Sequence, residues 1–280
     1  MRAGACLTAL IAIILLLPGV LTARAAEEVD LLLVLSSDVS RSIDTPKFKL
    51  QRDGYAAAIV NPRVIQAIRS GALGKIGISF VEWSGIGAQK IVIDWTIIHD
   101  EASAKDFSAQ VIEAPRAFAD RTSISGGIDF AVAQIARSPY HAARRTIDIS
   151  GDGNNNSGRD VTVARDEALA KGVTINGLVI LTENPSYVST DHTNPAGGLD
   201  NYYRNNVVGG PGAFVMVAEN FNSFGQAILN KLIAEIAANP YPKQAQLKVD
   251  FTSRKRFRKQ ALLAASRNEL YPSIDQPFLQ

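Results

Sequence analysis

Residues Leu31–Ser42 read LLLVLSSDVSRS, and this stretch organises the rest of the chain. Its apolar half shows no alternation, which is typical of a strand buried on both faces in a parallel sheet. The run ends in Asp38, Ser40 and Ser42, at the carboxyl end of the strand, where open α/β sheets place their ligands. A carboxylate and two hydroxyls form an all-oxygen surface that suits Mg²⁺, Mn²⁺ or Ca²⁺. Asp and Ser are also ordinary turn and N-cap residues, so this triplet needs support from elsewhere in the chain.

Two later segments carry oxygen-bearing side chains to comparable positions. Thr122 opens the segment TSISGGI, where its hydroxyl would sit at a helix N-terminus, and Asp152 follows the expected strand Ile147–Ser150. If that strand lies beside Leu31–Ser42, the chain order reverses between them, and Asp38 and Asp152 face each other across the switch-point crevice. An N-cap role for Thr122 and a turn at Asp152 are the ordinary alternatives. Because all three segments lead to one edge of the sheet, the sequence favours a shared cation site.

The remaining pattern alternates strands with helices. Strands are expected at Lys75–Trp83, Gln89–Ile98, Arg144–Asp152, Val173–Leu181 and Ala213–Ala218, and helices at Thr45–Val60, Arg63–Arg69, Ala102–Ile112, Arg121–Ser138, Arg159–Lys171 and Phe221–Ala238. Only Ser84–Ala88 separates the first two of these strands, which is too short for a helical crossover, so they should form an antiparallel hairpin at a sheet edge. The alternation predicts an α/β sheet with helices on both faces.

The segment Thr182–Gly212 is long and rich in Asn, Gly and Pro, and loops of this length in a compact domain are usually functional or mobile. It follows an expected strand, so it should emerge at the carboxyl edge of the sheet. Tyr202, Tyr203 and Arg204 are candidates for partner contact, because Tyr and Arg are favoured at binding hot spots. The alternative is that the two tyrosines pin the loop to the sheet.

The first 25 residues are expected to be an export leader. Arg2 supplies positive charge, Leu7–Leu21 is apolar, and a small-x-small cleavage site ends at Ala25. An uncleaved membrane anchor is the alternative, but the apolar run is short for a span and Pro18 interrupts it. Cys6 is the only cysteine of the sequence, so the exported protein would have neither disulfides nor thiol chemistry, which fits a bacterial periplasm.

The charge balance gives little sign of a nucleic-acid partner. Of the 29 Lys and Arg residues, two lie in the leader, which leaves 27 against 27 Asp and Glu residues. After a domain expected over residues 26–239, residues 240–280 form a basic C-terminal tail or small extension. Its run Arg254–Lys259 is either a solvated face or a contact for an anionic membrane or an acidic partner.

Several other chemistries fit the sequence poorly. The segment DGNNNSG, which starts at Asp152, lacks the Gly and Glu that an EF-hand calcium loop requires at fixed positions. The chain has no G-x-S-x-G elbow, no P-loop and no dinucleotide-binding glycine fingerprint. His99, His141 and His192 lack zinc-binding spacing and are expected to be solvated or structural.

These motifs resemble the metal-ion-dependent adhesion site of the von Willebrand factor type A domain. That pattern combines D-x-S-x-S, a later Thr in a T-x-I-x-x-G-I context, and a strand ending in Asp-Gly; the matching residues are Asp38, Ser40, Ser42, Thr122 and Asp152. The resemblance covers roughly Val29–Ala238. More narrowly, EVDLLLVLSSDVSRSID, RTSISGG and ISGDGNNNSGR resemble a bacterial exported family known as DUF1194.

The resemblance implies a Rossmann-like three-layer sandwich with a mostly parallel six-stranded sheet and one antiparallel edge strand. It also implies that Ser40 and Ser42 bind an ion directly, as does Thr122 or an Asp, depending on state. Asp38 and Asp152 would bind directly or through water, and a carboxylate from a protein partner would complete the coordination sphere. Mg²⁺ is the favoured divalent cation, with Mn²⁺ or Ca²⁺ as alternatives.

Two functions from different classes follow as hypotheses. The first is an exported, non-catalytic binding module that recognises a protein partner through a divalent cation. The second is a metal-dependent hydrolase of phosphate or ester substrates, in which the same ion acts as a Lewis acid. A hydrolase needs a general base beside the metal, and no His or Glu stands next to the three motifs, so the sequence favours a protein that is not an enzyme.

Overall fold

The computed structural model describes residues 26–181 and 190–237. The expected export leader and the basic C-terminal tail therefore lie outside the described residues. No helix among the described residues is both long enough and apolar enough to cross a membrane.

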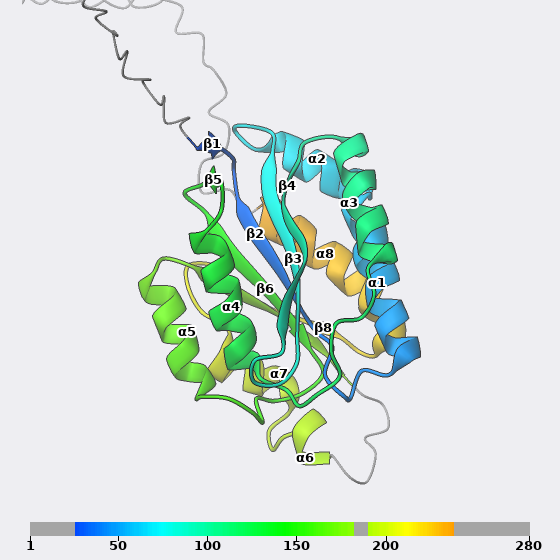
Figure 1. Cartoon of the computed structure of the whole chain (residues 1–280), viewed down its shortest axis with the longest axis vertical. Helices are drawn as coiled ribbons and strands as arrows, with labels where there is room; N and C mark the ends of the chain where they lie inside the picture. Colours follow the sequence, from blue (N-terminus) through cyan, green and yellow to red (C-terminus); the bar gives the residue numbers. More distant parts are fainter. Residues whose placement is uncertain (1–25, 182–189, 238–280) are drawn as a thin grey trace, which may run out of the picture.

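A six-stranded sheet forms the middle layer of the domain (Figure 1). Its strands lie in the order β4-β3-β2-β6-β7-β8, with the bounds Leu32–Asp38 (β2), Ile76–Trp83 (β3), Gln89–Ile98 (β4), Arg145–Gly151 (β6), Thr174–Ile180 (β7) and Val215–Ala218 (β8). Every neighbouring pair is parallel except β3 and β4. The chain runs to β3 on one side of β2 and later to β6 on the other, which is the switch point expected from the sequence. The predicted fold class is confirmed.

Strands β3 and β4 form an antiparallel hairpin at the edge of the sheet, joined by the short linker Ser84–Ala88. The amide of Ser84 donates to the carbonyl of Ala88 at 2.9 Å and closes the turn between β3 and β4. The pairing of these strands shifts register between Ile78 and Val81, an irregularity that increases local twist at the exposed edge. The predicted hairpin is confirmed.

Helices cover both faces of the sheet (Figure 1). One face carries α1 (Thr45–Ile59), α2 (Pro62–Ser70), α3 (Glu101–Glu113) and α8 (Phe224–Ala237), and the other carries α4 (Ile124–Ala136) and α5 (Val161–Ala170). Asp44 caps α1 by accepting from the amide of Lys47 at 2.9 Å, and Asn61 caps α2 in the same way through Arg63 at 3.0 Å. Each of these helices also has a proline in its first turn, where no amide hydrogen is needed.

The unbroken apolar run of β2 reflects the burial of both faces of this central strand. Leu33 and Leu35 belong to the core under α1 and α8, while Leu32 and Val34 belong to the core under α4 and α5. Both faces of β2 are therefore buried, as expected for a central parallel strand. Trp83, at the end of the neighbouring strand β3, is likewise fully buried.

The segment Thr182–Gly212, expected as a loop, contains three short helical pieces in its described part. They are α6 (Thr190–Thr193), α7 (Leu199–Tyr202) and a π-helical turn, η1 (Tyr203–Val207). Single turns carry too few residues for a helical period to be visible in the sequence. The same reason applies to the 3₁₀ turn η2 (Phe221–Ser223) and to the two-residue strands β1 (Glu27–Glu28) and β5 (Tyr140–His141), which pair in parallel outside the main sheet.

Candidate metal centre

The loop that follows β2 folds its polar side chains toward the end of β6. The amide of Ser40 donates to Asp38 Oδ1 at 2.7 Å, which fixes the turn immediately after the strand. The hydroxyls of Ser40 and Ser42 lie 3.1 Å apart, and Ser42 Oγ donates to Asp152 Oδ1 at 2.6 Å. Four of the five residues singled out in the sequence are thus brought together, although Ser42 and Asp152 are 110 positions apart in the chain.

An arginine that the sequence analysis did not single out holds this loop in place. Arg116 Nη2 donates to the carbonyls of Val39 at 2.7 Å and Ser40 at 2.8 Å. Its Nε donates to the carbonyl of Phe118 at 2.7 Å, so its planar guanidinium ties two loops together. No local sequence pattern marks such a contact between segments far apart in the chain.

A glycine lets the ends of β2 and β6 approach closely. A Cβ atom on Gly151 would lie 2.6 Å from the hydroxyl of Tyr203 and 3.1 Å from Asp38 Oδ2. The first distance is shorter than real side chains allow, so only glycine fits between the two groups. The carboxyl of Asp38 therefore reaches the β6 end without obstruction.

The two carboxylates are buried with incomplete hydrogen bonding. Asp38 and Asp152 are inaccessible to solvent, and the Oδ2 atom of each has no hydrogen-bond partner among the described residues. Burial, reinforced by the charge of Asp152, raises the pKa of Asp38 to about 8. Burial also raises the pKa of Asp152, while its hydrogen bond from Ser42 acts in the opposite direction. Lys47 Nζ stays 3.8 Å from Asp152 Oδ2, beyond hydrogen-bond distance.

The hydroxyl of Thr122 does not cap α4, because its neighbour takes that role. The N-cap of α4 is Ser123, whose Oγ accepts from the amide of Gly126 at 3.2 Å. The N-cap alternative for Thr122 is therefore wrong. The Thr122 amide donates to Asn156 Oδ1 at 3.0 Å, and its carbonyl accepts from the Asn156 amide at 3.0 Å. These bonds fasten Thr122 to the loop that begins at Asp152.

His192 is the residue that packs against Thr122. Its Nε2 lies 3.1 Å from Thr122 Oγ1, and its Nδ1 lies 2.7 Å from Asn154 Oδ1. A Cβ atom on Gly153 would come within 2.2 Å of this Nε2, so the glycine after Asp152 makes room for the ring. Burial lowers the pKa of His192, which favours the neutral imidazole. No histidine stands next to the three motifs in the sequence, but the fold brings His192 beside one of them.

The donor set fits a hard cation. Among residues 26–181 and 190–237, no three His, Cys, Asp or Glu side chains converge to hold a metal, so hydroxyl oxygens would have to complete any site. Two buried carboxylates with one unpartnered oxygen each, plus the hydroxyls of Ser40, Ser42 and Thr122, offer that chemistry. The residues present therefore fit a divalent ion.

The three candidates for partner contact lie in different environments. Tyr203 is fully buried, and its hydroxyl lies 3.4 Å from the carbonyl of Gly153. The suggestion that Tyr203 contacts a partner is therefore wrong, and this tyrosine pins the loop to the domain instead. Tyr202 is partly exposed, and its hydroxyl accepts from the amide of Asn155 at 3.2 Å. Arg204 forms an ion pair with Asp200 on the outer surface.

The fold is shared with solved structures that differ widely in sequence. Proximal thread matrix protein 1 from the mussel byssus is 13% identical, covers 76% of this chain and 49% of its own, and aligns with a TM-score of 0.52. The pilus adhesin SpaC from Lactobacillus rhamnosus GG is 12% identical, with 74% and 30% covered and a TM-score of 0.53. A von Willebrand factor type A protein from Catenulispora acidiphila is 13% identical, with 75% and 43% covered and a TM-score of 0.50. The chain thus spans about half or less of the length of these structures.

The chain therefore has an α/β fold like that of a von Willebrand factor type A domain. The family model described as "Protein of unknown function (DUF1194)" matches residues 28–240. The chain belongs to this family. A search of the curated proteins finds no significant match.

Proposed function

We propose that the protein is an exported, non-catalytic binding module that recognises a protein partner through a divalent cation. Asp38, Ser40, Ser42, Thr122 and Asp152 would hold the ion, and a partner carboxylate would complete its coordination sphere. The oxygen donors favour Mg²⁺, with Mn²⁺ or Ca²⁺ as alternatives. The leader pattern of residues 1–25 supports export to the periplasm or beyond.

The observation that carries this proposal is a buried carboxylate pair whose ion pair with Lys47 is long, 3.8 Å from Asp152 Oδ2. Asp38 and Asp152 are buried close enough for the charge of one to raise the pKa of the other, yet neither forms an ion pair within hydrogen-bond distance. A buried charge without a counter-ion is costly, and a divalent ion between the two oxygens would remove that cost. The related fold of proximal thread matrix protein 1 has been solved "with zinc occupied MIDAS motif", at 16% identity and a TM-score of 0.50, which supports a cation at this edge of such a fold.

Titration calorimetry with Mg²⁺, Mn²⁺ and Ca²⁺ tests the ion. Wild-type protein should bind at least one of them, and Asp38→Asn should weaken that binding by about 100-fold or more, because a coordinating charge is lost. Asp106→Asn, which changes an exposed Asp on α3, is the matched control and should bind as wild type does. Equal metal binding by Asp38→Asn and wild type, or none by either, would show that these residues are only caps and turns.

Capture from periplasmic extract tests the partner. Wild-type protein should retain a partner in the presence of the ion and release it with EDTA. The reason is that the ion would be bound both by the site of this chain and by a carboxylate of the partner. Asp38→Asn should retain nothing under either condition. A partner that stays bound in EDTA would place recognition elsewhere on the surface.

One observation keeps the hydrolase hypothesis as a second candidate. No general base stands next to the motifs in the sequence, but His192 lies 3.1 Å from Thr122 Oγ1, and burial lowers its pKa, which favours the neutral imidazole. A neutral imidazole beside a metal-bound water is a suitable base. Hydrolysis of p-nitrophenyl phosphate and p-nitrophenyl acetate by the metal-loaded protein, and its loss in His192→Gln, would support this candidate over the binding module.

A further inference from the structure

The turn between β3 and β4 presents an apolar side chain beside the candidate metal centre. In the sheet, Asp38 pairs with Trp83, the last residue of β3, so these two strand ends lie about 4.8 Å apart. Ile86 follows Trp83 by three residues, and it is 68% exposed although its side chain is aliphatic. Figure 1 shows the hairpin turn at the same end of the sheet as α6 and α7. A large apolar side chain is thus displayed close to the expected ion.

The turn that carries Ile86 is fixed to the segment of an expected ligand. The amide of Ser84 donates to the carbonyl of Ala88 at 2.9 Å, which closes the turn on itself. The carbonyl of Ser84 accepts from the amide of Ser123, the residue after Thr122, at 2.7 Å. Because these backbone bonds hold both the turn and its attachment, Ile86 keeps a set place relative to the site.

An exposed guanidinium lies on the same surface, between two of the expected ligands. Arg41 stands between Ser40 and Ser42, and its amide donates to the carbonyl of Asp120 at 2.8 Å, which fixes its backbone. Its side chain is 79% exposed, and its Nη2 lies 3.9 Å from Asp120 Oδ1, beyond hydrogen-bond distance. Within residues 26–181 and 190–237, its guanidinium forms no hydrogen bond. The donors of Arg41 are therefore available to a partner.

Asp120 joins these two features into one surface. A Cβ atom on Gly85 would lie 2.6 Å from Asp120 Oδ2, so this carboxylate packs against the turn that carries Ile86. Its other oxygen faces Arg41. Contacts therefore run without a gap from the turn through Asp120 to Arg41, which stands between two serines of the candidate metal centre. We call Ile86, Asp120 and Arg41 the rim.

The charge around the candidate metal centre favours an acidic partner. A divalent ion between Asp38 and Asp152 would balance the charge of those two carboxylates. Within five residues of the expected ligands, the ionisable side chains that reach solvent are Arg41, Lys47, Arg121, Asp44 and Asp120. Three of them are basic and two are acidic, so the loaded site would keep a positive balance. Such a balance attracts acidic segments and repels basic ones.

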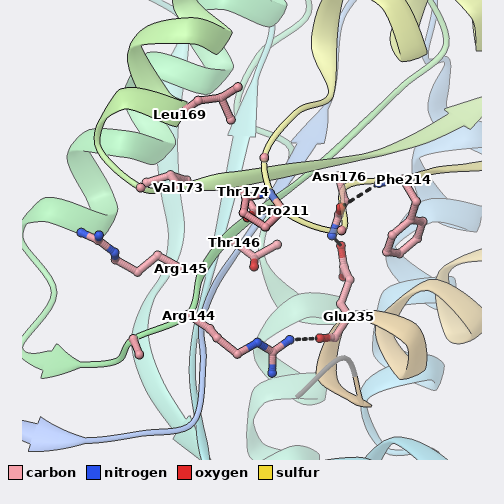
Figure 2. Close-up of a pocket in the computed structure, with 14 residues that line it drawn as sticks. Arg144, Arg145, Thr146, Leu169, Val173, Thr174, Asn176, Pro211, Phe214 and Glu235 are labelled. Atoms are coloured by element: carbon pink, nitrogen blue, oxygen red, sulfur yellow. Dashed lines mark hydrogen bonds between the residues drawn. The ribbon is translucent and has the colours of Figure 1, made fainter. Parts of the chain in front are cut away.

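The arginines of a pocket at the opposite edge of the sheet are engaged. This pocket occupies about 540 Å³ at the amino ends of β6 and β7 (Figure 2). Arg144 donates there to the carbonyls of Glu235 and Ile236. Arg145 packs against Gly172, because a Cβ atom on that glycine would lie 2.8 Å from its Nη2. The guanidinium of Arg41, in contrast, is both exposed and without such contacts.

We propose that the rim selects a protein segment with two carboxylates and an aliphatic side chain. One carboxylate completes the coordination sphere of the ion, the second pairs with Arg41, and the aliphatic side chain packs on Ile86. A planar guanidinium suits the second carboxylate, since it can bind one in bidentate fashion, and covering Ile86 removes apolar area from water. This inference rests on the function proposed above and adds the chemistry of the partner.

Selection from a displayed peptide library tests the proposal. The library is random except for a fixed central Asp, and it is selected on the mature full-length protein loaded with the ion that calorimetry finds to bind, with elution by EDTA. Peptides from wild type should carry a second acidic residue and a Leu, Ile or Val close to the fixed Asp. Selection on Arg41→Gln should lose the preference for the second acid, and selection on Ile86→Ser should lose the preference for the aliphatic residue.

Calorimetry with the most enriched peptide measures each contact. Arg41→Gln should weaken peptide binding by about tenfold, because it removes a charge-assisted hydrogen bond. Ile86→Ser should weaken it by about tenfold as well, because it removes an apolar contact. Arg41→Glu should prefer the peptide in which the second acid is replaced by Lys, a reversal that a merely structural role of Arg41 would not produce.

The controls separate the rim from the ion and from the rest of the surface. Arg145→Gln in the opposite pocket and Leu73→Ser, which changes a 50% exposed leucine, should bind the peptide as wild type does. Arg41→Gln and Ile86→Ser should still bind the metal ion, since neither side chain is an expected ligand. Absence of metal binding by wild type would overturn the proposed function and this inference with it. Metal binding without any enriched peptide, or with peptides that lack the second acid or the aliphatic residue, would overturn this inference alone.

Discussion

Two pairs of buried carboxylates lie in this domain, and their surroundings differ. At the carboxyl edge, Asp38 and Asp152 each leave one buried oxygen without a hydrogen-bond partner, and Lys47 stays 3.8 Å away. In the inner pair, Lys231 Nζ lies 2.6 Å from Asp148 Oδ1 and 2.5 Å from Glu235 Oε1. All three of these residues are almost inaccessible to solvent.

The difference shows that burying like charges does not by itself make a ligand site. The inner pair obtains its counter-ion from α8, although Asp148 Oδ2 and Glu235 Oε2 have no hydrogen-bond partner among the described residues. The edge pair has only the long ion pair between Lys47 and Asp152, and it lies at the carboxyl ends of β2 and β6, where open α/β sheets place their ligands. Both pairs solve the same electrostatic problem, one with a lysine and the other, we propose, with a metal ion.

The largest expected effect comes from removing the inner cation. Lys231→Met should lower the free energy of unfolding by about 3–5 kcal/mol, because it leaves two buried carboxylates without a counter-ion. Lys47→Met at the edge should change it by about 1 kcal/mol or less, since that lysine is partly exposed and its ion pair is long. Urea unfolding at neutral pH measures both. Similar losses in the two variants would mean that the edge pair also depends on an internal lysine.

Metal should stabilise the edge pair and leave the inner pair unchanged. At a metal concentration about 100-fold above Kd, mass action predicts a gain of about 2.7 kcal/mol in wild type. Asp38→Asn, which should bind about 100-fold more weakly or worse, should gain about 0.4 kcal/mol or less at the same concentration. Hydrogen exchange should slow near Asp38 and Asp152 but not near Lys231, because the ion contacts only the edge loops. A gain spread evenly over both regions would argue against a local site.

The inner pair should make stability depend on pH. Burial, together with the charge of Asp148, raises the pKa of Glu235 to about 7, above its ordinary 4.5. The folded state then binds more protons than the unfolded state between these values, so stability falls as pH rises through this window and levels off above it. Glu235→Gln should remove this part of the slope when urea unfolding is followed from about pH 4.5 to about pH 8. An unchanged slope would show that Glu235 does not titrate in this window.

The sheet could be predicted from the sequence, but the residues that surround the two carboxylate pairs could not. The unbroken run before Asp38 and the short Ser84–Ala88 linker predict a central parallel strand and an antiparallel edge, because both are local signals. The Lys231 contacts are not local: α8 must first pack on the sheet before its lysine meets Asp148. His192 was missed for the same reason, since its contact with Thr122 joins residues 70 positions apart.

His192 should act on the metal through Thr122. Its Nε2 lies 3.1 Å from Thr122 Oγ1, while its Nδ1 lies 2.7 Å from Asn154 Oδ1 and 3.2 Å from Asn156 Nδ2, so the ring holds the Thr122 hydroxyl in place. His192→Ala should therefore weaken metal binding by about tenfold, the lower end of the range for outer-sphere partners of metal ligands. Calorimetry measures this, and His141→Ala, which changes an exposed histidine, is the control. Unchanged affinity in His192→Ala would leave the ring with a packing role only.

The smallest expected effect concerns Lys47, a lysine near the edge pair. Lys47 lies 3.8 Å from Asp152 Oδ2, so its charge opposes a cation bound at the same oxygen. Lys47→Met should therefore tighten metal binding by a few-fold, about 1 kcal/mol or less, because a partly exposed charge is screened by water. The loop itself should stay in place, since Arg116 holds the carbonyls of Val39 and Ser40 independently. Lys49→Met, which alters an exposed lysine of the same helix paired with Asp53, is the matched control and should leave the affinity unchanged. Lys47 Nζ also donates to the carbonyl of Ser42 at 2.8 Å. If Lys47→Met instead weakens metal binding, this hydrogen bond positions the loop, and its loss outweighs the removal of the repulsive charge.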